Sequence, residues 1–206
     1  MQNVIAGVMN TSLVDWPTKV VDTFFLSGCN YRCPTCHNKD IAFTTQNDKT
    51  IKGSSELEKS VNRFLSGWID GIVLSGGEPT LYKKQSEWIV DNLYEYKIPV
   101  CVHTNATNLT FILKKINKVS LFCIDIKGPY KKYPELTGVT ESVSDIQNRF
   151  ETIFEEAKKN PHRFLFRTTL VPSLSIAEIE ETKDLVPEGL NYITQTYIKE
   201  NNHENS

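Results

Sequence analysis

Short apolar segments alternate with amphipathic helical segments along almost the whole chain. The apolar segments are rich in β-branched and aromatic residues, as strands are. They lie near residues 20–26, 71–75, 99–103, 120–126, 163–170 and 192–198. Apolar residues at helical spacing occupy the stretches between them, near residues 57–65, 88–96, 109–116, 143–157 and 176–186.

This alternation limits the fold to a small set. Strands that alternate with helices form a parallel sheet with right-handed crossovers. About six strand–helix units are too few for a closed eight-stranded barrel. We therefore expect an α/β fold, either a partial (β/α)6 barrel or a doubly wound sheet. Both architectures bind ligands at the carboxyl ends of their strands.

The composition is that of an ordinary globular protein. With 206 residues and a net charge of −2, the chain has the length of one domain and no overall basic field that would attract nucleic acid or anionic membranes. No run approaches the ~20 apolar residues of a membrane helix, and the amino terminus does not resemble a secretion signal. We expect a single domain over residues 1–200, a disordered polar tail at 201–206, and a cytoplasmic protein without nucleic-acid or membrane partners.

Three of the five cysteines, Cys29, Cys33 and Cys36, lie within eight residues at the spacing C-x3-C-x2-C. A disulfide framework uses an even number of cysteines spread along a small secreted chain, so these thiols favour a metal or an iron–sulfur cluster. Cubane clusters take four cysteine thiolates. A loop that offers three leaves one iron open to another ligand. The alternatives are a zinc site that uses Cys33, Cys36 and His37, and unrelated free thiols.

Cys101 and Cys123 stand apart from this loop, inside two of the predicted strands. Buried cysteine commonly behaves as a small hydrophobic residue. We therefore expect both side chains in the core, without a role in the cluster.

A second motif, Ser-Gly-Gly-Glu-Pro at residues 75–79, follows the second predicted strand. Alone, it could be a turn before a helix, with Glu78 at the amino terminus of that helix. Together, C-x3-C-x2-C after one strand and Gly-Gly-Glu-Pro after the next resemble the radical S-adenosylmethionine superfamily. The resemblance implies a partial barrel, a [4Fe-4S] cluster on Cys29, Cys33 and Cys36, and S-adenosylmethionine on the open iron.

Segments 11–17, 36–38, 125–129, 136–138 and 167–172, with Tyr133, resemble one group within that superfamily. The group comprises the activating proteins of anaerobic ribonucleoside-triphosphate reductase, which are related to other glycyl-radical-enzyme activases. The resemblance implies that flavodoxin or ferredoxin reduces the cluster and that S-adenosylmethionine is cleaved to methionine and a 5′-deoxyadenosyl radical. This radical would take a hydrogen atom from a glycine Cα of the reductase.

The resemblance also implies how the cofactor is held. Gly76, Gly77 and Glu78 would receive its amino group. Its ribose requires paired donors and acceptors, and its carboxylate requires a cation. The candidates near the predicted strand ends are Thr104, Asn105 and Asp125 for the ribose, and Lys127 or Arg167 for the carboxylate.

The chain departs from the superfamily pattern at two positions. Thr35 stands before the third cysteine, where an aromatic residue near the adenine is usual, and Tyr31 is a candidate to replace it. Ala106 follows Thr104 and Asn105 where a glycine is common. These departures leave the adenine and ribose contacts open.

Two other functions remain open for this sequence. One is a radical enzyme that acts on a small molecule or peptide in cofactor or modified-nucleoside biosynthesis. The other is a non-catalytic iron–sulfur or zinc module, which would hold its metal with four protein ligands. The small chain has no cysteine-rich insertion for further clusters, which favours the activase.

Overall fold

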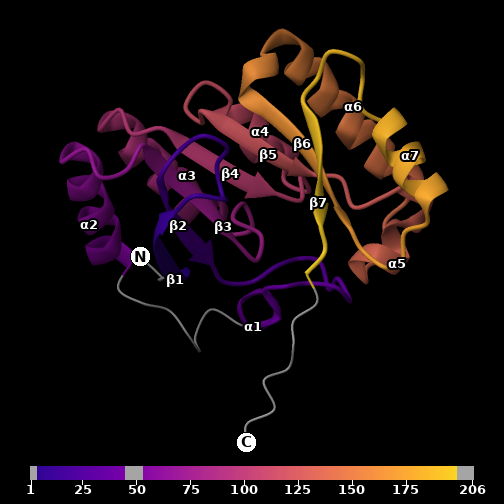
Figure 1. Ribbon diagram of the computed structural model, residues 1–206, viewed down its shortest axis with the longest axis horizontal. Coiled ribbons are helices and arrows are strands. Elements are labelled where there is room, and N and C mark those ends of the chain that lie inside the picture. The colour runs from indigo at the N-terminus through magenta and orange to yellow at the C-terminus, as the bar shows by residue number, and fades with distance from the viewer. Residues whose placement is uncertain (1–3, 45–52, 199–206) are drawn as a thin grey trace, which may run out of the picture.

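The structure is a computed structural model that describes residues 4–44 and 53–198. Its strands form one seven-stranded sheet in the order of the chain (Figure 1). The strands are β1 (Ile5–Ser12), β2 (Val21–Leu26), β3 (Gly71–Gly76), β4 (Val100–Thr104), β5 (Leu121–Asp125), β6 (Phe164–Leu170) and β7 (Tyr192–Thr196). β1 pairs antiparallel with β2, and each later pair is parallel.

The sheet is an open barrel. β1 and β7 are its two edges and do not pair with each other within the described residues. A doubly wound sheet would reverse its strand order at a switch point, whereas this order follows the sequence throughout. The prediction of a partial barrel is confirmed.

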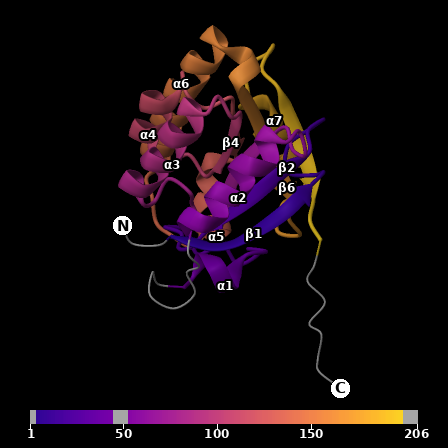
Figure 2. The same ribbon diagram turned by 90° about the vertical axis from the view of Figure 1, so that its left-hand side faces the viewer.

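The helices follow the predicted alternation. They are α1 (Lys39–Ala42), α2 (Gly53–Leu65), α3 (Lys83–Glu95), α4 (Leu109–Lys115), α5 (Tyr133–Thr137), α6 (Val143–Lys159) and α7 (Ile176–Asp184), with 3₁₀ turns η1 (Tyr130–Lys132) and η2 (Pro161–Arg163). Figure 2 shows α2, α3, α4 and α6 together on one face of the sheet. Within the described residues, no helix is both long and apolar enough to span a membrane. The tail predicted at residues 201–206 lies outside the described residues.

β1 is the strand that the sequence pattern missed. It is an edge strand with several exposed positions, and its pairing with β2 shifts register between Ile5 and Gly7 and again between Met9 and Ser12. Each shift disturbs the alternation of apolar and polar residues that marks a strand. The short helices α1 and α5 also escaped prediction, because four or five residues cannot display a helical period.

Helix α6 shows how local signals and packing combine. The Ser142 side chain caps its amino terminus by accepting a hydrogen bond from the Asp145 N–H (3.1 Å). Its apolar face is buried against the sheet, and Phe150 lies at the centre of an aromatic cluster with ring centroids 5.6 Å from Tyr130 and 6.2 Å from Tyr133. This cluster anchors the helix beside the carboxyl ends of the strands.

We expect Phe150→Ala to lower the free energy of unfolding by about 3–5 kcal/mol, because the side chain is fully buried and its loss leaves a cavity. Urea denaturation followed by circular dichroism measures the change. Val143→Ala on the same helix is the matched control, since Val143 is exposed, and should change stability by less than about 0.5 kcal/mol. Equal effects of the two substitutions would contradict the packing described here.

Candidate active site

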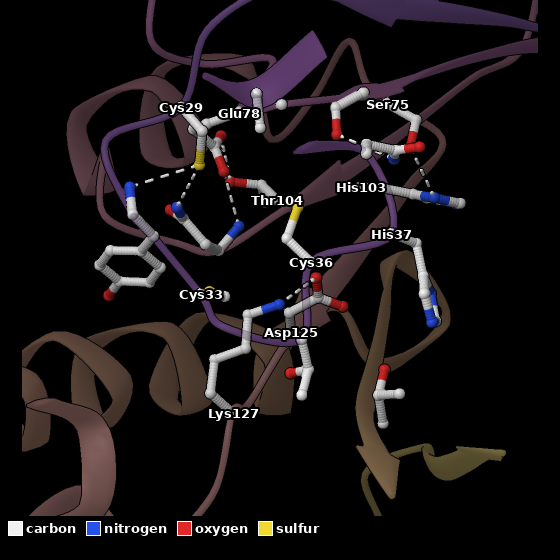
Figure 3. Close-up of a pocket in the computed structure, with 18 of the residues that line it drawn as sticks. Cys29, Cys33, Cys36, His37, Ser75, Glu78, His103, Thr104, Asp125 and Lys127 are labelled. Carbon is white, nitrogen blue, oxygen red and sulfur yellow. Dashed lines mark hydrogen bonds and ion pairs between the residues drawn. The ribbon is translucent and has the colours of Figure 1, made fainter. Parts of the chain in front are cut away.

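A cavity of about 220 Å³ lies at the carboxyl ends of the strands (Figure 3). Its walls come from the loop after β2 and from the ends of β3, β4, β5, β6 and β7. The eleven residues singled out from the sequence all line it: Cys29, Cys33, Cys36, Gly76, Gly77, Glu78, Thr104, Asn105, Asp125, Lys127 and Arg167. The fold therefore brings together groups that lie up to 138 positions apart in the chain, from Cys29 to Arg167.

The cysteine loop is held from several sides. The Gly28 N–H donates to the Ile41 carbonyl (2.9 Å), and the Arg32 N–H donates to the Thr137 carbonyl (2.6 Å). The Asn105 amide donates to Asn30 Oδ1 (2.9 Å). These contacts tie the loop to α1, α5 and the end of β4, so the three thiols are fixed relative to the barrel.

The number and placement of the thiols suit an iron–sulfur cluster, because all three line the cavity. Burial raises the pKa of Cys29 to about 11 and raises the pKa of Cys33 above its ordinary value, although the Lys127 charge opposes the shift at Cys33. Iron would have to displace these protons, and its positive charge would stabilise the buried thiolates. The other two cysteines of the chain do not line the cavity, so a cubane here would have three cysteine ligands and one open iron.

The zinc alternative finds no support at this loop. Within the described residues, Cys33, Cys36 and His37 do not form a group with the spacing of ligands around one metal ion. The His37 ring instead stacks on Tyr197, with ring centroids 4.9 Å apart. This contact joins the cysteine loop to the residue just after β7, across the open side of the barrel.

The Gly-Gly-Glu-Pro segment packs directly against the cysteine loop. The Gly77 N–H donates to the Leu26 carbonyl and the Glu78 N–H to the Gly28 carbonyl, both at 2.8 Å. A Cβ atom on Gly77 would lie 1.9 Å from the Gly28 oxygen, so only glycine allows this approach. The segment is therefore more than a turn before a helix, because it forms one wall of the cavity.

Glu78 is buried and serves as a common acceptor. Its carboxylate accepts hydrogen bonds from the Thr80 N–H (3.0 Å) and hydroxyl (2.6 Å), the Thr104 hydroxyl (2.7 Å) and the Asn105 N–H (2.7 Å). Burial raises the pKa of Glu78, and these four donors oppose that rise. The carboxylate thus joins the ends of β3 and β4.

Ala106 occupies a position that favours glycine. Its φ of 64° lies in the left-handed region, and its N–H donates to the Thr104 hydroxyl (3.1 Å). Alanine adopts this conformation at a modest energetic cost, so the turn after β4 forms without the usual glycine.

The other departure from the superfamily pattern is Thr35, for which Tyr31 is the candidate aromatic replacement. Tyr31 is buried, and its hydroxyl lies 3.4 Å from both Glu141 and Arg149.

Asp125, Lys127 and Arg167 form a charged group on the opposite wall from Glu78. Asp125 pairs with Arg167 Nε at 2.5 Å and with Lys127 Nζ at 3.0 Å. Burial disfavours the Asp125 charge, but the two cations outweigh burial and hold the pKa of Asp125 well below its usual range. One carboxylate balances two cations, which leaves a net positive charge facing the cavity.

His103 and Ser75 also line the cavity. The sequence indicated neither as a site residue, although Ser75 begins the Ser-Gly-Gly-Glu-Pro motif. His103 Nδ1 lies 3.5 Å from Ser75 Oγ, and His103 Nε2 lies 2.8 Å from the Asp15 carbonyl oxygen. The available signal was a histidine inside an otherwise apolar strand. The Asp15 carbonyl oxygen near His103 Nε2 belongs to a distant loop, so this contact cannot be inferred from the strand pattern.

The sequence matches one superfamily and two proteins that are named as activating enzymes. Residues 23–186 match the Radical SAM superfamily. A Methanocaldococcus jannaschii protein, provisionally named a glycyl-radical enzyme activating enzyme, is 33% identical over 187 residues, which cover 90% of this chain and 75% of that protein. The pyruvate formate-lyase-activating enzyme of Streptococcus mutans is 30% identical over 122 residues, which cover 58% of this chain and 41% of that enzyme.

Solved structures share the fold at low sequence identity. Streptococcus suis SuiB bound to S-adenosylmethionine aligns with a TM-score of 0.62 at 17% identity, over 85% of this chain and 40% of SuiB. Coproporphyrinogen III oxidase from Escherichia coli aligns with a TM-score of 0.57 at 13% identity, over 90% of this chain and 46% of that enzyme. The chain thus spans less than half of either protein. With its match over residues 23–186 and a partial barrel like theirs, the chain belongs to the radical S-adenosylmethionine superfamily, whose members use a [4Fe-4S] cluster and S-adenosylmethionine.

Proposed function

We propose that this protein is an activase that generates a glycyl radical on anaerobic ribonucleoside-triphosphate reductase. The convergence of three thiols and eight candidate cofactor contacts on one cavity is the observation that carries the proposal. The names of the archaeal and streptococcal relatives support the activase class. The segments around Asp125, Tyr133 and Arg167 support the reductase as target, because they resemble those of its activating proteins.

In this proposal Cys29, Cys33 and Cys36 hold the cluster. When bound and reduced by flavodoxin or ferredoxin, the cluster would supply the electron for cleavage of S-adenosylmethionine. The backbone of Gly76 and Gly77 would receive the amino group, at a turn that glycine allows to pack against Leu26 and Gly28. Glu78 supplies negative charge behind that wall while it positions Thr104 and Asn105.

The charged group would bind the anionic end of the cofactor. Lys127 acts electrostatically on Cys33, which makes it the better candidate for a carboxylate beside the cluster. Arg167 is held by Asp125 at 2.5 Å and is exposed over only 14% of its side chain. We therefore assign Lys127 to the methionine carboxylate, Arg167 to the orientation of Asp125, and Asp125 and Asn105 to the ribose.

The proposed substrate is a glycine-bearing loop of the reductase, and the proposed site of action is the cytoplasm. Such a loop needs an entrance, and β7 is an edge strand whose residues are largely exposed. His37 and Tyr197 stack at this edge. We propose that residues 1–200 work as one domain and that the loop enters beside β7.

Electron paramagnetic resonance tests the function. The anaerobically reconstituted, reduced protein is mixed with S-adenosylmethionine and the reductase, and we expect a glycine-centred doublet. A reductase with its radical glycine changed to alanine is the control and should give no doublet. If S-adenosylmethionine is cleaved but no glycyl-radical protein yields a doublet, the enzyme acts on another substrate, such as a small molecule or peptide.

We expect Cys33→Ala to abolish cleavage of S-adenosylmethionine, because the cluster would lose one of its three protein ligands. Iron and sulfide content and the release of 5′-deoxyadenosine measure the effect, with iron falling from about four atoms per chain to less than about one. Lys39→Ala is the control, since this exposed residue just follows the loop, and it should keep iron and turnover. A Cys33→Ala protein with full turnover would refute the cluster assignment.

We expect Asp125→Asn to lower the stability of the cluster-free protein by ~1–3 kcal/mol at neutral pH, because Lys127 and Arg167 would lose their shared carboxylate. The folded-state pKa of Asp125 is depressed. Its contribution is therefore present above the unfolded-state pKa of about 3.9 and is lost as the pH falls through the lower, folded-state value.

Urea midpoints of the Asp125→Asn variant and the unsubstituted protein, compared from about pH 7 down to about pH 3, measure this difference. The gap should narrow on acidification. Asp184→Asn, at an exposed position near the end of α7, serves as the control and should track the unsubstituted protein. A gap that stays constant with pH would show that the Asp125 charge does not stabilise the fold.

A further inference from the structure

Beneath the cavity, the concave face of the sheet carries a second group of metal-binding side chains. Cys101 and His103 lie two positions apart on β4 and so share a face of the sheet. Cys123 on β5 lies directly opposite His103 in the parallel register. All three side chains are buried, and none is needed for the cluster or the cofactor contacts proposed above.

The spacing of the three side chains suits one ion. Their ligand atoms all lie within 4.8 Å of one another, and the two sulfur atoms are 3.6 Å apart. Two thiolates on a tetrahedral Zn²⁺ at about 2.3 Å would lie about 3.8 Å apart. A disulfide would instead require about 2.0 Å between the sulfur atoms.

The hydrogen bond of His103 to Asp15 is of the kind that metal-binding histidines make. The Asp15 carbonyl oxygen can only accept a hydrogen bond, so His103 Nε2, 2.8 Å away, carries the proton. The other ring nitrogen, Nδ1, then has the acceptor lone pair, with Ser75 Oγ 3.5 Å away. Histidine ligands of metals typically donate their other ring N–H to a carbonyl or carboxylate in this way.

We propose that Cys101, His103 and Cys123 form a second metal site, for a soft divalent cation such as Zn²⁺. Binding replaces the two thiol protons, so the ion, two thiolates and a neutral imidazole carry no net charge, which suits a buried position. His103 lines the cavity, so the fourth position would be open to a water from the cavity.

The first test uses the full-length protein with its cluster reconstituted, loaded with Zn²⁺ and desalted. Zinc is counted by mass spectrometry, and its ligands are measured by X-ray absorption at the zinc edge, which does not register iron. We expect about one zinc per chain with two sulfur ligands at about 2.3 Å and one nitrogen at about 2.0–2.1 Å. A shell of three sulfur atoms would place the zinc in the cysteine loop and overturn the proposal, as would the absence of zinc or a Cys101–Cys123 disulfide found by mass.

Variants test the same assignment. Cys123→Ala should lower zinc retention at least about tenfold, while Val73→Ala should retain the metal. Val73 is the matched control, because it is buried in the same interior cluster and offers no ligand. A protein with Cys29, Cys33 and Cys36 all changed to alanine should lose iron but keep the zinc and its spectrum. Loss of zinc from that triple variant, or its retention by Cys123→Ala, would refute the site.

Discussion

The close approach of two backbone segments, the loop after β2 and the turn after β3, organises the site. Gly77 lies so near the Gly28 carbonyl that a Cβ atom would be 1.9 Å from that oxygen. This approach allows the Gly77 N–H to bond to the Leu26 carbonyl at the end of β2, and the Glu78 N–H to bond to the Gly28 carbonyl in the cysteine loop. It also buries Glu78, whose carboxylate then holds the end of β4. The loops after β2, β3 and β4 carry the thiols and most of the candidate cofactor contacts. The contact between Gly77 and Gly28, which requires glycine, thereby positions all three loops.

The concave face of the sheet changes from apolar to charged along the direction of the strands. Alternate residues of a strand share a face, so Cys101 is followed by His103 on β4, and Cys123 by Asp125 on β5. On β6, Leu165 is followed by Arg167, which pairs in register with Asp125. The amino-terminal layer packs as a core, while the carboxyl-terminal layer keeps charges that the cavity can use.

Charge balance explains how this interior tolerates ionised groups. An isolated buried charge is costly, whereas a paired and hydrogen-bonded one is not. Asp125 holds both Lys127 and Arg167, and Glu78 has four donors. The pKa values of the two carboxylates therefore shift in opposite directions. Burial raises the pKa of Glu78, while the neighbouring cations lower the pKa of Asp125. The cavity therefore offers a neutral-to-anionic wall and a cationic wall to a zwitterionic cofactor.

The sequence by itself determined the elements and the identity of the chemical groups. Periodicity located six of the seven strands and the five longest helices, because each such signal lies within one local segment. The spacing of Cys29, Cys33 and Cys36 likewise marked a metal-binding loop. Periodicity did not locate β1, because shifts of register disturb the alternation of apolar and polar residues in this strand.

Only the tertiary structure decided which groups meet. The contact of Glu78 with Thr104, the stacking of His37 on Tyr197 and the juxtaposition of His103 with Cys123 each join separate segments. They depend on strand order and register, which arise from packing of the whole sheet and leave no mark in any short stretch of sequence.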